Sequence, residues 1–461
     1  MELTIKNNYM VRPKHPTLHG CLSLSEIDQI GTMTHARSIY FNKRPIRCET
    51  SSHDRTGDTL RESLSRVLIP FYPLAGLLRW IDQEDQVHQK GRLELDCNDK
   101  GVALIEAELN VELANFGDFT PSPNYQYLFP DIDYNIPIHE LPILFVQITK
   151  FKCGSISLSL AVSHVVADGT SIGHFTREWA RLPRGEIVDT LPFHDRNVLQ
   201  ARDPPVLSPR FEHSKDFMAD PPDLIQPSGE EEKRMKRTVI QLRLSQNQVE
   251  RLKKLANDHS NVNIGAKFSR YEAIAAHLWR TICKARNNKD EQPTALFVTI
   301  DSRRRLQPPL PIGFFGNGIL DLTGTSTAGE LVSKPLGYGA SRVRDVINKI
   351  TNTYMFAAIE YLKTQQDLRR FRFLYLSSPE DFIGNPNVSL LSWLNLPLYD
   401  MDFGWGKEAY FGPGELKIDG ESVLFESRDG DGSLVLLICL PIKHVDAFKK
   451  FFYQDMMNSS L

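Results

Sequence analysis

Apolar side chains occupy every second position between Ser155 and Ser163, separated by small or polar residues. The apolar positions are Ile156, Leu158, Leu160 and Val162. This period of two predicts a strand with one buried face. We expect the strand to end at His164, because the alternation stops there.

A helix is expected soon after this strand. Its apolar positions, at helical spacing, are Ile172, Phe175 and Trp179. Thr170 or Ser171 can cap the helix, since it begins after Gly169. The pattern therefore places His164 at the end of a strand and Asp168, four residues later, at the start of a helix.

Similar patterns recur along the rest of the chain. Strands are expected to end at residues 39–41 and to cover Ile143–Phe151, Thr238–Leu244 and Leu296–Ile300. Helices are expected over Thr59–Ile69, after the capping boxes Ser245–Gln248 and Ser269–Glu272, and over Val445–Tyr453. Strands and helices interleave in both halves, which predicts an α/β (mixed α+β) protein.

A chain of 461 residues exceeds what one hydrophobic core commonly holds. We expect two domains of similar size, residues 1–188 and 238–461, each a mixed sheet flanked by helices. Residues 189–237 contain seven prolines and are expected to form a crossover linker. We also expect a segment near residues 370–397 to pack with the N-terminal domain.

Composition excludes several classes of function. The net charge is −3 and no long basic block is present, so nucleic acid is not an expected partner. The N-terminus lacks the apolar core of a signal peptide, and the longest apolar stretch, Leu434–Ile442, is too short to span a bilayer. The six cysteines form no Cys-x-x-Cys pair, which argues against disulfides and zinc. We expect a cytoplasmic monomer without a membrane partner or a metal.

His164 is the strongest candidate for chemistry, and we interpret it as the base of an acyl transfer. The His-x-x-x-Asp pattern alone is weak in a chain with 13 histidines, but His164 is the one histidine followed by an aspartate four residues later. Its place at a strand end adds weight, because strand ends in layered folds line clefts. The alternative is a structural histidine. A metal pair is less favoured, since the intervening residues supply no further ligand.

Three other motifs have plain structural alternatives. Residues 169–173 match Gly-x-Ser-x-Gly, but Ser171 falls inside the predicted helix, whereas a nucleophilic serine directly follows its strand. The three arginines after Asp301 suit either an electrostatic clamp or a solvated loop. The motif Asp402-Phe-Gly-Trp-Gly406 suits a tight turn held by packing.

Together these motifs resemble the BAHD acyl-CoA-dependent acyltransferases of plants. The resemblance rests on His164-Val-Val-Ala-Asp168-Gly169 and Asp402-Phe-Gly-Trp-Gly406, which lie about 230 residues apart as in that family. Further matching features are Tyr40, Trp279-Arg280, Asp301-x-Arg303-x-Arg305, Gly316-Asn317, Gly412-Pro-Gly414 and Phe448–Tyr453. The stretches LSEIDQIGTMTH, SRYEAIAAHLWR and GNPNVSLLSWLNLP resemble hydroxycinnamoyl transferases, in particular those that acylate spermidine.

The resemblance implies a two-domain fold with a channel between the domains, where acyl-CoA and acceptor enter from opposite faces. His164 would be the general base, Asp168 would point away and pair with Arg303, and Trp393 would help to position the tetrahedral intermediate. Asp402 is often grouped with the histidine in this family, although its motif would be structural. Substrate contacts are expected from Ser38, Tyr40, Gly169 and Ser392. Acyl-CoA would be a co-substrate, with no other cofactor.

Charge suggests the acceptor. Residues 375–402 contain no lysine or arginine to hold a shikimate or quinate carboxylate, and Leu391 replaces the threonine found near that point in shikimate-acylating relatives. The same stretch holds the carboxylates Glu380, Asp381, Asp400 and Asp402. These acids could bind the distal ammonium of a polyamine, and the alternative is that they are surface acids. We therefore expect hydroxycinnamoyl transfer to an amine of spermidine or a related polyamine. O-acylation of an alcohol and a non-catalytic binding protein are the alternatives.

Overall fold

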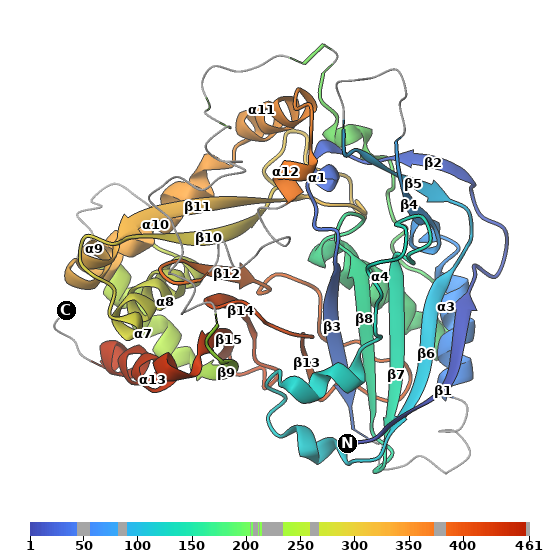
Figure 1. The fold of residues 1–461 in the computed structure, drawn as a ribbon, viewed down its shortest axis with the longest axis horizontal. Coiled ribbons are helices and arrows are strands. Elements are labelled where there is room, and N and C mark those ends of the chain that lie inside the picture. The colour runs from blue at the N-terminus through green and yellow to red at the C-terminus, as the bar shows by residue number, and fades with distance from the viewer. Residues whose placement is uncertain are drawn as a thin grey trace.

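Two six-stranded sheets form the framework of the protein (Figure 1). The computed structural model describes residues 1–43, 56–81, 90–202, 204–205, 211, 213, 234–258, 267–372 and 384–457. The first sheet has the order β1 (Leu3–Val11), β6 (Val102–Leu109), β7 (Leu144–Phe151), β8 (Ile156–Ser163), β3 (His35–Asn42) and β13 (Tyr410–Pro413). The β6–β7 pair is parallel and the other pairs are antiparallel, so the sheet is mixed.

The second sheet is also mixed. Its order is β11 (Ile319–Thr327), β10 (Pro293–Asp301), β12 (Val388–Ser392), β14 (Glu421–Glu426), β15 (Leu434–Pro441) and β9 (Arg237–Leu244). β12 is parallel to both of its neighbours. A small third sheet consists of β2 (Gly20–Ser23), β5 (Leu93–Cys97) and β4 (Leu77–Trp80). The mixed α/β class expected from the sequence is confirmed.

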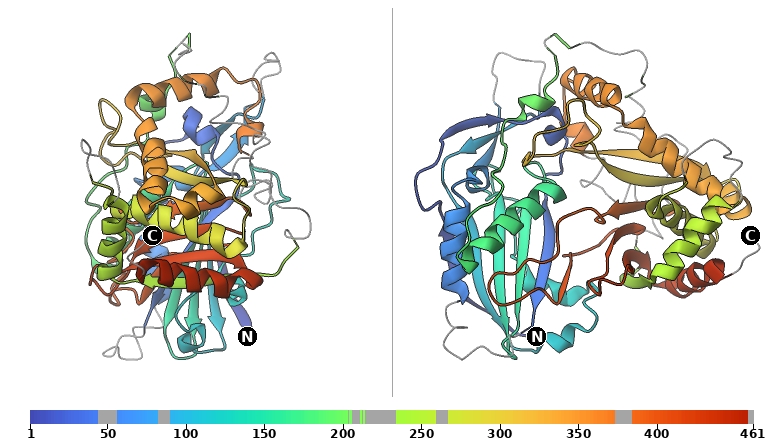
Figure 2. Two further views of the ribbon diagram at one scale, coloured as in Figure 1. Left: turned by 90° about the vertical axis from the view of Figure 1, so that its left-hand side faces the viewer. Right: turned by 180° about the vertical axis from the view of Figure 1, so that it is seen from behind.

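Helices cover one face of the first sheet. The helices of this half are α1 (Glu26–Gln29), α3 (Thr56–Val67) and α4 (Gly169–Arg181), with short 3₁₀ turns η1 (Tyr72–Ala75), η2 (Leu113–Phe116), η3 (Pro123–Leu128) and η4 (Leu182–Arg184). α3 and α4 pack on the apolar side of β8, which is the face that its period of two predicts (Figure 2). The expectation of only one buried face is wrong, because all eight residues of β8 are buried. Trp179 of α4 is fully buried and donates a hydrogen bond to Ser63 Oγ of α3 at 3.0 Å, which fastens the two helices together.

The larger core lies between the second sheet and its helices. These helices are α7 (Gln246–Asn257), α8 (Arg270–Arg286), α9 (Ala328–Ser333), α10 (Leu336–Lys349), α11 (Asn352–Lys363), α12 (Arg369–Arg372) and α13 (Ile442–Met457). The capping boxes predicted at Ser245 and Ser269 are present at the N-termini of α7 and α8. Figure 1 shows α7, α8, α10 and α13 on the side of the second sheet that faces away from the first.

The chain crosses between the halves more than once. η5 (Arg196–Leu199) lies in the region expected to be the crossover linker, of which residues 203, 206–210, 212 and 214–233 are outside the described part. Of the segment expected near 370–397, β12 belongs to the second sheet, and residues 373–383 are not described. β13 then returns to the first sheet and pairs with β3. The proposed domain boundaries stay a prediction.

Candidate active site

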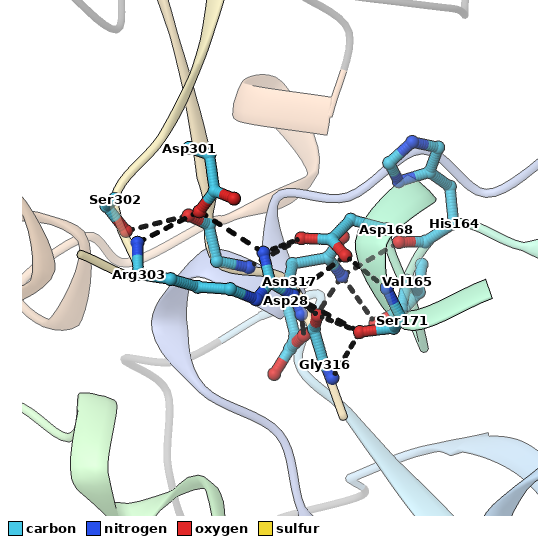
Figure 3. Close-up of polar contacts among 11 residues, drawn as sticks. Asp28, His164, Val165, Asp168, Ser171, Asp301, Ser302, Arg303, Gly316 and Asn317 are labelled. Atoms are coloured by element: carbon cyan, nitrogen blue, oxygen red, sulfur yellow. Dashed lines mark hydrogen bonds and ion pairs between the residues drawn. The ribbon is translucent and has the colours of Figure 1, made fainter. Parts of the chain in front are cut away.

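His164 directly follows β8, as the sequence predicts. Its backbone N–H donates to the carbonyl of Thr34 at 3.3 Å, just before β3 begins. The side chain is partly exposed, and no described residue hydrogen bonds with the imidazole. In Figure 3 the ring points away from the polar cluster around Asp168. The described hydrogen bonds of His164 are therefore all made by its backbone.

Asp168 stabilises the loop between His164 and α4. It is the N-cap of α4, where its Oδ1 accepts the N–H of Ser171 at 3.0 Å, so the cap is neither Thr170 nor Ser171 as expected from the sequence. Arg303 binds both carboxylate oxygens, at 2.7 and 2.8 Å, and the N–H of Gly318 donates to Oδ2 at 2.9 Å. The ion pair expected with Arg303 is thus present, and the carboxylate points away from His164 (Figure 3).

Asp168 is held as a carboxylate. Burial raises the pKa of this carboxyl, but the charge of Arg303 and the hydrogen bonds from Arg303, Gly318 and Ser171 outweigh burial and leave the pKa below its ordinary value. A bidentate arginine with two backbone donors satisfies the buried charge. Asp168 therefore fixes the loop between His164 and α4 electrostatically.

Ser171 is a structural residue, which excludes it as the nucleophile of the Gly-x-Ser-x-Gly match. It is fully buried in the first turn of α4. Its hydroxyl donates to the carbonyl of Gly316 at 2.9 Å and accepts the N–H of the same residue at 3.1 Å. The hydroxyl thus ties α4 to the loop that joins β10 and β11.

Trp393 follows β12 and bridges the two halves. Its ring packs against Phe411 of β13, with centroids 5.6 Å apart, and against Phe425 of β14 at 6.4 Å. The ring thus contacts apolar clusters of both halves. The side chain is partly exposed, and the indole N–H has no acceptor among the described residues. The role expected for Trp393 at the tetrahedral intermediate stays a prediction.

The segment after Trp393 packs on the start of α4. A Cβ added to Gly169 would lie 2.8 Å from Leu396 Cδ1, so this glycine permits close contact between the two segments. Gly169 and Ser392 are both partly exposed, and their substrate contacts stay predictions.

Tyr40 and Ser38 differ in exposure. Tyr40 is 2% exposed, and its ring lies 4.5 Å from that of Phe411, so it packs within the core. Ser38, two positions earlier on β3, is partly exposed. The substrate contacts expected from Ser38 and Tyr40 both stay predictions, and Ser38 is the more accessible of the two.

The Asp402 motif forms a turn. Oδ1 of Asp402 accepts the N–H groups of Gly404 at 2.8 Å and Gly406 at 2.9 Å. Both glycines have φ near +99°, a conformation that favours glycine. Phe403 is buried edge-to-face on Trp179, with centroids 5.1 Å apart, and Arg184 donates to the carbonyl of Asp402. These contacts give the Asp402 carboxylate a structural role in the turn, as the resemblance implies for this motif. Its grouping with the catalytic residues stays a prediction.

Comparison with known proteins covers nearly the whole chain. The model of the Transferase family matches residues 1–455. The chain belongs to this family. The BAHD resemblance expected from the His164 and Asp402 motifs is thereby confirmed, and the chain is an acyl-CoA-dependent acyltransferase. The finer resemblance to spermidine hydroxycinnamoyl transferases stays a prediction.

Several characterised proteins are similar to this BAHD chain. It is 41% identical over 98% of its length to hydroxycinnamoyl-CoA:piscidic acid hydroxycinnamoyltransferase of Actaea racemosa, covering 99% of that protein. It is 36% identical to shikimate O-hydroxycinnamoyltransferase of Nicotiana tabacum, over 98% of this chain and 100% of that protein. It is 34% identical to hydroxycinnamoyl-CoA:5-hydroxyanthranilate N-hydroxycinnamoyltransferase of Avena sativa, over 98% of this chain and 99% of that protein. The structure of vinorine synthase shares the fold, with a TM-score of 0.69, 23% identity, and 97% and 96% coverage.

The acidic residues expected around the acceptor have varied surroundings in this BAHD chain. Asp400 is exposed and forms an ion pair with Lys407 at 2.5 Å. Asp402 belongs to the turn described above. Glu380 and Asp381 lie outside the described residues. Two of the four carboxylates are therefore engaged by protein groups.

The contacts of three residues that hold the His164 loop were not predicted from the sequence, although Asn317 and the stretch around Asp28 were among the features shared with the family. Asn317 donates to the carbonyls of His164 and Val165, while Asp28 and Arg196 lie directly behind it. The pattern Ser25-x-x-Asp28 is a capping box and gave a local signal for Asp28, but its contact with Asn317 is not local.

Two kinds of feature are absent from the described residues. There, no three His, Cys, Asp or Glu side chains come together as a metal site would need. No described helix combines the length and apolar character needed to cross a membrane.

Proposed function

We propose that this chain transfers a hydroxycinnamoyl group from its CoA thioester to a hydroxyl or amine of a small acceptor, with His164 as general base. The observation that carries this proposal is a partly exposed imidazole with no described hydrogen-bond partner. It stands on a loop whose carbonyls at residues 164 to 166 accept hydrogen bonds from Asn317 and Arg196. The printed activities of the similar proteins, which name hydroxycinnamoyl transfer to three different acceptors, support the acyl group.

The reaction needs one base and one oxyanion donor. The acceptor O–H or N–H gives its proton to the neutral imidazole of His164 while its O or N bonds to the thioester carbonyl carbon. The resulting oxyanion can accept a hydrogen bond from the indole N–H of Trp393. When the carbonyl re-forms, the C–S bond breaks and the CoA thiolate takes the proton from the imidazolium. The thioester is already activated, so direct attack needs no other cofactor and no acyl-enzyme.

For the acceptor, we propose an amine of spermidine or a related polyamine. This proposal rests on Glu380 and Asp381 and on the lack of lysine and arginine in residues 375–402, since Asp400 and Asp402 have other partners. A second candidate is an acceptor that carries a carboxylate. It is favoured by the acceptors of the three similar proteins, which are piscidic acid, shikimate and 5-hydroxyanthranilate.

One competition experiment tests both the hydroxycinnamoyl transfer and the polyamine acceptor. Purified protein receives coumaroyl-CoA with spermidine, putrescine, tyramine, shikimate, quinate, piscidic acid and anthranilate together, and products are identified by mass. Spermidine amides are expected. Predominant esters, or amides of anthranilate, would overturn the polyamine acceptor and keep hydroxycinnamoyl transfer. Intact coumaroyl-CoA with no product would overturn the proposed acyl donor.

The carboxylates can be tested separately. If Glu380 and Asp381 hold the distal ammonium, the double variant Glu380→Gln/Asp381→Asn raises the KM for spermidine, because two opposite charges are lost. The matched control is Asp400→Asn, whose carboxylate is paired with Lys407 and whose KM is expected to equal that of the wild type. An unchanged KM in the double variant would contradict the acidic acceptor site.

A further inference from the structure

A buried carboxylate lies behind the His164 loop. Asp28 of α1 is completely buried and receives donors on both oxygens. The N–H and hydroxyl of Ser25 donate to Oδ2 at 2.9 and 2.7 Å. The backbone N–H and the side-chain amide of Asn317 both donate to Oδ1, at 2.8 and 2.9 Å. The carboxylate thus fixes the position and orientation of the Asn317 side chain (Figure 3).

Asn317 in turn holds the residue proposed as the base. Its Nδ2 donates to the carbonyl of His164 at 2.9 Å and to that of Val165 at 3.2 Å. Asn317 lies in the loop between β10 and β11, whereas His164 ends β8 in the other sheet. One side chain of the second half therefore fixes two successive peptide groups of the His164 loop.

Arg196 continues this arrangement from a third segment. Its Nη1 lies 2.9 Å from Oδ2 of Asp28, and its Nη2 donates to the carbonyl of Val166 at 2.9 Å. Both side chains of this ion pair are buried. The carbonyls of three successive residues, 164 to 166, are thus held by two side chains that share the Asp28 carboxylate.

The packing leaves the loop little room to move. A Cβ added to Gly31, just after α1, would lie 2.8 Å from the carbonyl oxygen of His164. Buried ion pairs of this kind add little net stability compared with apolar packing, because the charges lose their hydration. Stability alone is therefore a weak reason for a buried Asp28–Arg196 pair at this site, and a defined position of the loop is a better one.

We propose that Asn317 is a positioning residue for His164, anchored by Asp28. It sets the backbone of His164 and so the direction from which the imidazole approaches the acceptor proton. Misplacement of a catalytic group by about 1 Å costs up to roughly 10²-fold in rate. The proposal rests on the proposed function, since it assumes that His164 is the base.

The test compares two buried asparagines in the full-length protein. Asn317→Ala removes both donors to the loop, and Asn387→Ala is the matched control. Asn387 is fully buried, and its side-chain oxygen accepts the N–H of Ala295 at 2.9 Å. Asn387 comes just before β12, whereas Trp393 comes just after it, so the two residues lie at opposite ends of this strand. Asn317→Ala is expected to lower kcat by up to about 10²-fold at unchanged KM. Asn387→Ala is expected to lower Tm and leave kcat unchanged.

A double variant separates positioning from general loss of structure. If Asn317 acts through His164, then His164→Ala/Asn317→Ala is as slow as His164→Ala alone, because there is no longer a base to position. If Asn317→Ala does not fold, Asn317→Ser, which keeps a hydroxyl donor, takes its place with the same expected direction.

Two results would overturn the proposal. One is a wild-type kcat for the Asn317 variant. The other is a further loss of rate when the Asn317 substitution is added to His164→Ala. Failure of the proposed function is a different result, namely full activity of His164→Ala.

Discussion

Asp168 and His164 are four residues apart, yet their side chains have different partners. Asp168 binds Arg303 and two backbone N–H groups, while the imidazole of His164 is turned the other way. Removing one partner of a buried ion pair costs about 3–5 kcal/mol. Asp168→Asn is therefore expected to lower the free energy of unfolding by an amount in this range at neutral pH, as measured by urea unfolding.

The same variant has a defined pH dependence. Because the pKa of Asp168 is lowered in the folded state, its carboxylate stabilises the protein above the unfolded pKa, which is near 3.8. This contribution is lost as the pH falls through the lower, folded pKa. The difference in stability between wild type and Asp168→Asn should thus shrink below about pH 4. A difference that stays constant down to pH 2 would contradict the electrostatic account.

Trp393 is tested by removing its N–H and keeping an aromatic ring. Trp393→Phe keeps most of the packing on Phe411, but it loses the proposed oxyanion donor, so kcat is expected to fall by about 10²-fold or more. Trp405→Phe is the control, because Trp405 stacks on Phe403 in the turn after Asp402. Equal kcat values in the two variants would exclude the indole N–H of Trp393 from the reaction.

At the scale of elements, the turn from Asp402 to Gly406 fixes the chain between β12 and β13. Asp402→Asn keeps an oxygen that can accept from Gly404 and Gly406, whereas Asp402→Ala removes it. The alanine variant is expected to lose about 0.5–1.5 kcal/mol, because two exposed N–H groups exchange the carboxylate for water, while kcat of the folded protein is retained. Thermal melts and initial rates of both variants check this. A large fall in kcat at unchanged Tm would instead support a catalytic role for Asp402.

The elements that the sequence predicts are those with local signals. The period of two gave β8 and its end at His164, and the capping boxes gave the starts of α7 and α8. Contacts between distant segments have no such signal. The pairing of β13 with β3 and the bond between Asp28 and Asn317, 289 positions apart, depend on how the two halves dock.

The residues of the candidate site also differ in how far the sequence predicts them. His164 and the Asp168–Arg303 pair followed from a motif and a family resemblance. The burial of Tyr40 could not be predicted in this way, because the pattern of one strand does not show that Phe411 of a later strand packs on it. The engagement of Asp402 by its own glycines required the backbone conformation of the turn.

At the scale of the whole molecule, buried histidines make stability depend on pH. Burial lowers the pKa of His35, His194 and His277 to about 4, against a weaker opposing effect of a backbone hydrogen bond in each case. In the unfolded chain these residues take up protons near pH 6.5, whereas in the folded chain they do so near pH 4. The free energy of unfolding is therefore expected to decrease as the pH falls from about 6.5 to 4.

His277 offers a test of this effect. It is buried in α8, and its Nε2 donates to the carbonyl of Phe452 in α13 at 2.8 Å. His277→Gln removes one such group and should make Tm fall less steeply between pH 6.5 and 4.5. The exposed His139, replaced by glutamine, is the control and should leave the slope unchanged. Equal slopes in the two variants would contradict the assignment.

The most direct test of the central claim is the rate of CoA release by His164→Ala. The rates of wild type and variant are measured on coumaroyl-CoA and the acceptor selected by the competition experiment. Equal Tm values of the two proteins show that the variant is folded. The account predicts that the variant loses about 10²–10⁴-fold in kcat, because a general base contributes that much. A variant that is folded and as fast as the wild type would contradict the assignment of His164 as the base.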